Sequence, residues 1–185
     1  MNTVYFVTKN EYKFNELKKV LDNYDIKLEQ IPEDTVEIQA DSCEEVAGFS
    51  AKSSANKYGK PVVKADFGFF IDCFNGFPGP YVKYFADKVG IKKFLELINN
   101  ENNRNAYLSY VITYCEPNKE PVLFSSRIDG TIIHDCDENV KWFSDVFIPK
   151  GQKLTLGQMS DEKKDKIFNS AERKFAEWYV KNKSN

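Results

Sequence analysis

The chain has 185 residues, of which 42% are hydrophobic and 29% charged, a balance typical of a globular domain with a sizeable core. The net charge is -2 without a strongly basic face, which argues against a nucleic-acid polymer as partner but leaves a single nucleotide possible. No apolar run is long enough for a bilayer, the cysteines are widely spaced, and a strand-like run follows Met1 directly. We therefore expect a cytoplasmic protein with neither a signal peptide nor a membrane partner.

The first third of the chain predicts two strands and two helices. Residues 4–8 are typical of a buried strand, and the apolar spacing that follows them predicts an amphipathic helix. Residues 26–31 predict a second strand. The second helix should begin at Asp41 or Ser42, either of which can cap it, and end at Gly59.

The rest of the chain predicts a bent strand, a broken helix, a hairpin and a helical C-terminal region. These elements should span residues 62–66 and 69–72 around Gly68, 81–97 around Gly90, 106–114 with 122–133, and 159–180. Strands that alternate with helices, together with a long hairpin, predict an α/β fold with a mixed sheet. No repeat or long linker divides the chain, so we expect a single domain over residues 1–185.

The junction between the first strand and the first helix is a candidate anion site. Free backbone N–H groups and the helix dipole both favour negative charge at such a place. Thr8 and Asn10 put hydrogen-bonding side chains there, and Lys13 lies one turn into the helix. These residues taken alone favour a simpler interpretation, in which Asn10 caps the helix and Lys13 is a solvated lysine.

The spacing of these residues points to a nucleotide. Thr8, Asn10 and Lys13 form a Thr-x-Asn-x-x-Lys motif, which resembles the motif that contacts the triphosphate in inosine triphosphatase-like, non-canonical purine nucleoside triphosphate pyrophosphatases. The segment 75–85 is similar to the Gly-Pro-Gly-x-Tyr segment of that family, and it is the most specific match. Further matches follow in the family's order at residues 37–39 with Lys52, 61–68, 147–151 and 159–167. The resemblance therefore covers almost the whole chain.

This resemblance implies a fold, a reaction and a set of site residues. The family fold is an elongated mixed sheet flanked by helices, with a nucleotide cleft between two lobes. The family reaction hydrolyses a nucleoside triphosphate to a monophosphate and pyrophosphate with Mg²⁺, and family members are commonly homodimers. By resemblance, Glu37 and Asp66 bind the metal, and Asp66 also prepares the attacking water. Thr8, Asn10, Lys13 and Lys52 would bind the phosphates, and Lys13 with Asp66 would be catalytic.

The sequence departs from the family pattern where the acidic strand end and the base should lie. Ala65 replaces one of two adjacent acids, which should weaken metal binding. The elements that recognise the base align with Trp142, Phe143 and Ser144, and later with Asn169, whereas Lys164 matches a family lysine. These five residues are the candidates for contacting the base. The aromatic ones either stack on it or fill space in a core.

Three hypotheses remain open. The first is an active pyrophosphatase with altered base preference, because the phosphate and metal elements are largely present. The second is a degenerate homologue that binds a nucleotide or a partner without turnover, since Ala65 and the triplet Phe168-Asn169-Ser170 have lost family side chains. The third is a purely structural or interaction protein.

Overall fold

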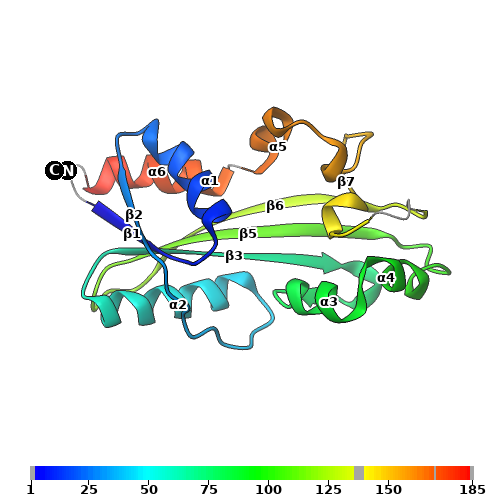
Figure 1. Ribbon diagram of the computed structural model, residues 1–185, viewed down its shortest axis with the longest axis horizontal. Helices are drawn as coiled ribbons and strands as arrows, with labels where there is room; N and C mark the ends of the chain where they lie inside the picture. Colours follow the sequence, from blue (N-terminus) through cyan, green and yellow to red (C-terminus); the bar gives the residue numbers. More distant parts are fainter. Residues whose placement is uncertain (1–2, 136–139, 169, 184–185) are drawn as a thin grey trace. The chain divides into compact units, whose positions relative to one another are not determined.

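A computed structural model describes residues 3–135, 140–168 and 170–183, which form a mixed seven-stranded sheet with six α-helices (Figure 1). The strands are β1 (Thr3–Val7), β2 (Lys27–Ile31), β3 (Val62–Ile71), β4 (Pro78–Gly79), β5 (Asn105–Cys115), β6 (Val122–Ile132) and β7 (Phe147–Pro149). The helices are α1 (Glu11–Asp22), α2 (Cys43–Tyr58), α3 (Val82–Val89), α4 (Ile91–Leu97), α5 (Asp161–Phe168) and α6 (Ser170–Lys183).

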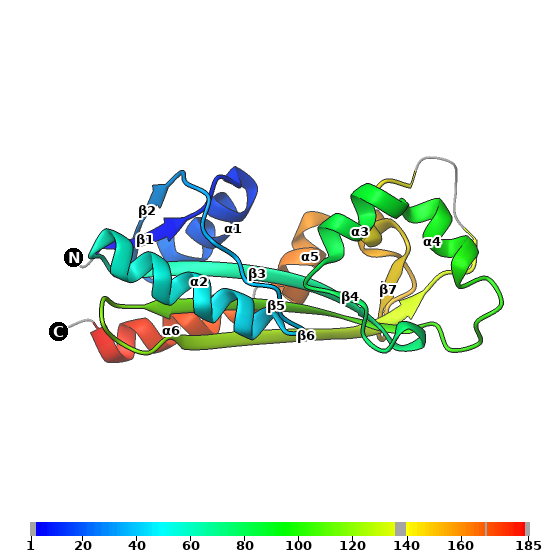
Figure 2. The same cartoon turned by 90° about the horizontal axis from the view of Figure 1, so that it is seen from below.

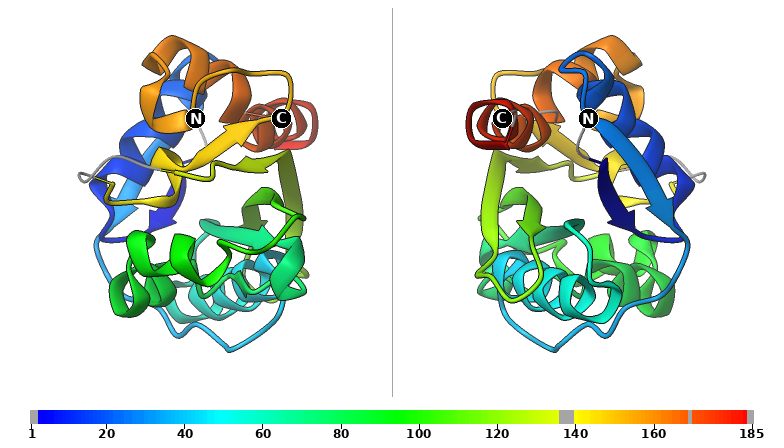
Figure 3. Two further views of the ribbon diagram at one scale, coloured as in Figure 1. Left: turned by 90° about the vertical axis from the view of Figure 1, so that its right-hand side faces the viewer. Right: turned by 90° about the vertical axis from the view of Figure 1, so that its left-hand side faces the viewer.

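The sheet combines parallel and antiparallel pairs, which confirms the predicted α/β class. Its order is β2-β1-β3-β5-β6-β7, and β4 pairs with β3. The strand β1 runs parallel to both β2 and β3, with Phe6 opposite Gln30 on one side and Val63 on the other (Figure 3, right). The β3–β4 and β6–β7 pairs are antiparallel. The strands β3, β5 and β6 run side by side (Figure 2).

Most of the predicted element boundaries are confirmed, but the prediction of a bend at Gly68 is wrong. Ser42 caps α2 through its side chain, and Gly59 ends that helix with a φ of 62°. The predicted break near Gly90 separates α3 from α4. In contrast, β3 continues through Gly68 as one ten-residue strand. Pairing with β1 near its start and with β4 near its end keeps the strand extended, so the local tendency of glycine to bend does not prevail.

By its internal contacts the chain divides into two compact units. Unit 1 contains residues 1–66, 110–126 and 169–185, and unit 2 contains residues 67–109 and 127–168. In unit 1, α1 and α6 cover one face of the sheet and α2 covers the other (Figure 1). Over the described part of the chain, no helix is both long enough and apolar enough to cross a membrane.

Alternation along β3 supplies both cores of unit 1. Val63 faces the cluster beneath α1 and α6, which contains Leu17 and Phe175, whereas Val62 faces α2 and packs with Ala51. All five of these side chains are buried, with an exposed fraction of 0%. Because Lys64 and Asp66 follow Val62 at the two-residue period of a strand, they lie on the α2 face.

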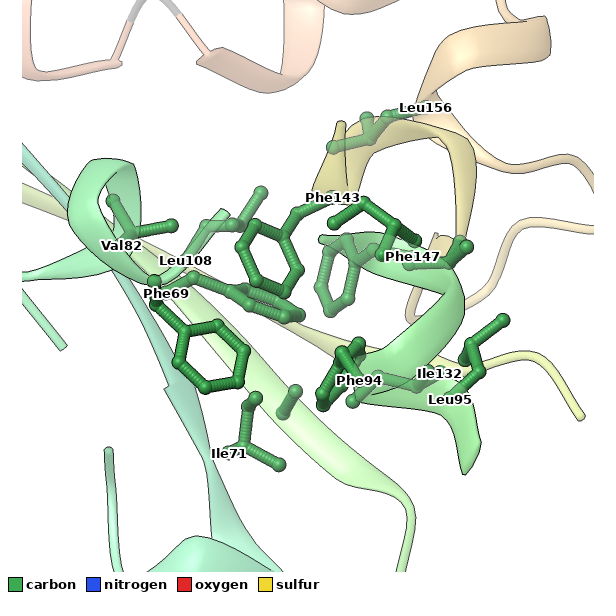
Figure 4. Close-up of a cluster of buried hydrophobic side chains, with 14 of the residues drawn as sticks. Phe69, Ile71, Val82, Phe94, Leu95, Leu108, Ile132, Phe143, Phe147 and Leu156 are labelled. Carbon is green, nitrogen blue, oxygen red and sulfur yellow. The ribbon is translucent and has the colours of Figure 1, made fainter. Parts of the chain in front are cut away.

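Unit 2 is held together by an aromatic core. Phe69, Phe94, Phe143 and Phe147 point toward one another in Figure 4, and each is at most 1% exposed. The ring centroids of Phe69 and Phe143 lie 4.6 Å apart, and those of Phe94 and Phe143 lie 5.4 Å apart. Residues of α3, α4 and β7 join this cluster, so part of the high aromatic content of the chain serves packing.

Gly130 of β6 is a position at which one added methyl group should be costly. An ideal Cβ there would lie 2.3 Å from the carbonyl oxygen of Ile148 and 2.5 Å from the ring of Phe147. We expect Gly130→Ala to lower the free energy of unfolding by about 1–3 kcal/mol, measured by urea denaturation. Gly48→Ala in α2 is the matched control, because its Cβ would meet only a side-chain atom of Leu123 at 4.0 Å. That control should raise stability by about 0.5–1 kcal/mol, and equal effects of the two variants would contradict this account of Gly130.

Candidate functional site

The turn from β1 into α1 is fixed by its own hydrogen bonds. The backbone N–H of Asn10 donates to Thr8 Oγ1 at 3.0 Å, and Asn10 Oδ1 accepts from the N–H of Lys13 at 3.1 Å. The carbonyl of Thr8 accepts from Gln30 Nε2 of β2 at 3.0 Å. Asn10 is therefore the N-cap of α1, and the turn offers a rigid frame at the positive end of the helix dipole.

Lys13 connects this turn with the middle of β3. It is half-buried, and its ammonium lies 3.4 Å from the carbonyl oxygen of Ala65. This contact brings the Lys13 side chain to the residue directly before Asp66, although 52 positions separate Lys13 from Ala65 in the sequence. The lysine of the predicted phosphate motif and the predicted catalytic carboxylate thus belong to one neighbourhood in unit 1.

Lys64 is a further charged residue of this neighbourhood, and sequence reasoning did not identify it. Its side chain is buried in β3, and its ammonium donates to the carbonyl of Val7 at 2.8 Å and to Thr35 Oγ1 at 2.7 Å. Burial lowers the pKa of Lys64 to about 8, an effect that Glu37 and Asp66 oppose and Lys13 reinforces. These three charged groups therefore lie within electrostatic range of the Lys64 ammonium. In the sequence, the signal that could have identified Lys64 is its position within a run of buried strand residues.

Glu37 lies on a segment whose two preceding residues, Thr35 and Val36, are held by hydrogen bonds. Thr35 accepts the hydrogen bond from Lys64, and the carbonyl of Val36 accepts one from Ser50 Oγ of α2 at 3.0 Å. Glu37 itself is exposed, whereas Asp66 is half-buried. Glu37 is thus a solvent-accessible carboxylate on a segment that hydrogen bonds hold in place.

The oxygen donors of Glu37 and Asp66 suit a hard divalent cation. Mg²⁺ in nucleotide sites is commonly bound by one or two carboxylates, with phosphate oxygens and water completing its shell. Within the ranges 3–135, 140–168 and 170–183, no three His, Cys, Asp or Glu side chains gather into a metal cluster. Glu37 and Asp66 would therefore offer at most two carboxylates to such an ion, which would need further oxygen ligands from water or a ligand.

Lys52 contacts a different part of unit 1. It lies exposed on α2, and its ammonium pairs with Glu120 Oε1 at 2.5 Å. Glu120 belongs to the turn between β5 and β6. In this structure the Lys52 ammonium is therefore held at the β5–β6 turn. An exposed ion pair of this kind contributes only about 0–1 kcal/mol, so it restrains the lysine weakly.

The candidates for contacting the base that the structure describes occupy unit 2, and they differ in accessibility. Phe143 is 1% exposed inside the aromatic core, where it fills space. Trp142 is half-buried, and its ring lies 5.9 Å from that of Phe143. Lys164 is half-buried, with its ammonium 3.4 Å from Asp161 Oδ1. Asn169, another of the five candidates, lies outside the described residues.

Ser144 lies in a single turn of 3₁₀-helix, Phe143–Asp145, which the Asp145 side chain stabilises. Asp145 Oδ2 accepts hydrogen bonds from the backbone N–H groups of Lys141 at 2.9 Å and Trp142 at 3.1 Å. The hydroxyl of Ser144 lies 3.3 Å from Asp145 Oδ1. The carboxylate next to Ser144 therefore caps the backbone that carries Trp142.

Comparisons with known proteins cover nearly the whole chain. The model of the Ham1 family matches residues 4–178. A protein of Methanopyrus kandleri named dITP/XTP pyrophosphatase is 40% identical over 182 residues, which are 97% of each chain. A protein of the same name from Methanosarcina mazei is 37% identical over 182 residues, covering 97% of this chain and 98% of that one.

Solved structures of two bacterial proteins share the fold. The Ham1 protein of Staphylococcus aureus superposes with a TM-score of 0.85 at 23% identity, covering 98% of this chain and all 100% of that one. The Ham1 protein of Coxiella burnetii gives a TM-score of 0.88 at 21% identity with the same coverage. At these identities the likeness bears on the fold alone, and it supports the mixed α/β sheet described above.

Proposed function

This chain belongs to the Ham1 family, and we propose that it hydrolyses a non-canonical purine nucleoside triphosphate to the monophosphate and pyrophosphate. One observation carries the proposal: the Lys13 ammonium extends from the N-terminal turn of α1 to the residue before Asp66. This contact supports a site in unit 1 in which the helix terminus would bind phosphate and the Asp66 carboxylate would orient water. The names of the relatives from Methanopyrus kandleri and Methanosarcina mazei point to deoxyinosine and xanthosine triphosphates as substrates.

We assign the phosphate end to Thr8, Asn10 and Lys13. The N–H groups of the first turn of α1 and the Lys13 ammonium supply positive charge where phosphate oxygens would lie. As the transition state spreads charge over those oxygens, fixed donors stabilise it without reorganising. Lys52 would join them after exchanging its weak pairing with Glu120.

Glu37 and Asp66 would hold the divalent cation, which we propose is Mg²⁺. When bound, the ion neutralises phosphate charge as a Lewis acid. Asp66 also accepts the hydrogen bond that orients the attacking water toward phosphorus. Glu37 approaches from the anchored segment after β2, so the two carboxylates come from separate parts of the chain.

We propose that Trp142, Ser144, Lys164 and Asn169 contact the base, and that Phe143 supports Trp142 from the core. Because the family side chains that normally face the purine are replaced, we expect discrimination between bases to differ from that of other family members. A single domain over residues 1–185, assembled as a homodimer in the cytoplasm, completes the proposal. Sedimentation equilibrium should give twice the chain mass of 21.4 kDa.

A panel of triphosphates tests the activity. With Mg²⁺, we expect the protein to release pyrophosphate from inosine, deoxyinosine or xanthosine triphosphate faster than from ATP or GTP. Deoxyuridine triphosphate should be included, because the base site is altered. If calorimetry shows binding while no triphosphate releases pyrophosphate at high protein concentration, the catalytically degenerate alternative is correct.

Lys13→Ala tests the phosphate end. Loss of the ammonium should lower kcat/KM by roughly 10²–10³-fold, because charge stabilisation in the transition state is lost. Lys18→Ala on the same helix is the control, since the Lys18 ammonium pairs with Asp22 at 2.7 Å within α1. Similar losses in the two variants would contradict the assignment of Lys13.

A further inference from the structure

The buried Lys64 ammonium joins three segments of the chain at the proposed metal site. The residue belongs to β3, and its ammonium contacts the carbonyl of Val7, the last residue of β1, and Thr35 on the segment after β2. Its exposed fraction is 7%. Burying an ammonium is costly unless acceptors and opposite charges compensate it, so these contacts indicate a built position for a cation.

Two carboxylates lie near this cation. Asp66 is two residues after Lys64 in the same strand. Because side chains alternate between the two faces of a strand, Lys64 and Asp66 lie on the same face. Glu37 is two residues beyond Thr35, whose hydroxyl accepts the Lys64 hydrogen bond. Both carboxylates lie within electrostatic range of the ammonium, as do Asp34 and Lys13. Asp34 is ion-paired with Lys9 at 2.5 Å, so Glu37 and Asp66 are the acidic groups that matter here.

We propose that Lys64 is a positioning residue whose ammonium acts as a built-in cation near Glu37 and Asp66, so that the nucleotide-free protein binds divalent ions weakly. This inference rests on the pyrophosphatase function proposed above. The Lys64 ammonium already compensates part of the negative charge of Glu37 and Asp66, and it repels a second cation. The divalent ion therefore enters together with the triphosphate, whose oxygens supply the additional negative charge.

Binding of Mn²⁺ to the nucleotide-free protein, followed by electron paramagnetic resonance of the free ion, tests the proposal without requiring turnover. Lys64→Met keeps the length of the side chain and removes its charge. We expect it to bind Mn²⁺ at least about tenfold more tightly than the wild type, because repulsion is removed. Lys64→Arg should restore wild-type affinity, since it keeps the charge.

Two further variants separate charge from hydrogen bonding. Lys64→Gln is neutral but retains an N–H donor, so it should also bind Mn²⁺ more tightly, and it serves if Lys64→Met does not fold. Thr35→Val removes the hydrogen-bond acceptor but keeps the ammonium, so its Mn²⁺ affinity should stay within about threefold of the wild type.

A second measurement concerns catalysis. In both neutral variants the Mg²⁺ concentration that gives half-maximal pyrophosphate release should fall, whereas a purely structural role of Lys64 would lower kcat without moving that concentration. Equal Mn²⁺ affinity in the wild type, Lys64→Met and Lys64→Gln would overturn the inference. Failure of the wild type to release pyrophosphate would instead count against the proposed function, and the Mn²⁺ result would still decide the role of the charge.

Discussion

Asp66→Asn is expected to abolish pyrophosphate release, with kcat lowered by roughly 10²–10⁴-fold at saturating Mg²⁺ and substrate. Asparagine has nearly the same shape, but its neutral amide neither carries the negative charge of a carboxylate nor accepts a proton as a carboxylate does. The position matters because Asp66 follows the residue whose carbonyl lies 3.4 Å from the Lys13 ammonium. Initial rates of pyrophosphate release, compared at several Mg²⁺ concentrations, measure the loss.

Asp72→Asn provides the matched control for this variant. Asp72 is an exposed carboxylate that comes directly after the end of the same strand, and it belongs to unit 2. We expect its kcat to remain within about twofold of the wild type, since surface substitutions away from such sites have small effects. Both variants should melt close to the wild-type temperature. Wild-type kcat in Asp66→Asn would show that the catalytic carboxylate lies elsewhere.

The strand and helix pattern could be predicted because it depends on neighbours in the sequence. Ser42 and Gly59 act within one helical turn of the ends of α2, so capping rules predicted that helix. The tendency of Gly68 to bend was also a local signal, but hydrogen bonds from β1 and β4 outweigh it. Where distant strands decide the backbone, propensity is a weak guide.

The site could be predicted only in part, because its contacts join distant residues. Lys64 reaches acceptors 57 and 29 positions away, so no local pattern reveals it as part of a charged centre. Lys52 occupies a motif position, but its partner Glu120 is 68 positions away. Whether Phe143 stacks on a ligand or fills a core depends on Phe69 and Phe94, which surround it.

Glu172 is a buried acid that the proposed reaction does not use, and it should make stability depend on pH. It is the third residue of α6 and is 4% exposed, and its Oε2 has no hydrogen-bond partner among the described residues. Burial raises the pKa of its carboxyl to about 7, and the Glu16 carboxylate acts in the same direction. Hydrogen bonding by the backbone and by Tyr110 opposes this increase without cancelling it.

The raised pKa fixes the sign of the pH dependence. Below about pH 4.5 the carboxyl is neutral in both the folded and unfolded states, so it imposes no ionisation penalty. Between pH 4.5 and about 7 the unfolded chain ionises while the folded protein retains the proton, and stability falls as the pH rises. Above pH 7 the full penalty is present. The difference between 4.5 and about 7 corresponds to at most about 3 kcal/mol.

Glu172→Gln should therefore stabilise the protein at pH 8 by up to about 3 kcal/mol and have little effect near pH 4.5, because glutamine never ionises. Urea unfolding at both pH values measures this difference. Glu177→Gln, at an exposed position of the same helix, should change stability by less than about 0.5 kcal/mol at either pH. A gain of equal size at both pH values would mean that packing, rather than ionisation, governs the effect of Glu172. Burial raises the pKa of Tyr110, and the charges of Glu172 and Asp66 both act in the same direction, so Glu172 and Asp66 lie within electrostatic range of one residue. A stabilised Glu172→Gln variant that keeps wild-type kcat would also show that Glu172 does not take part in the proposed catalysis.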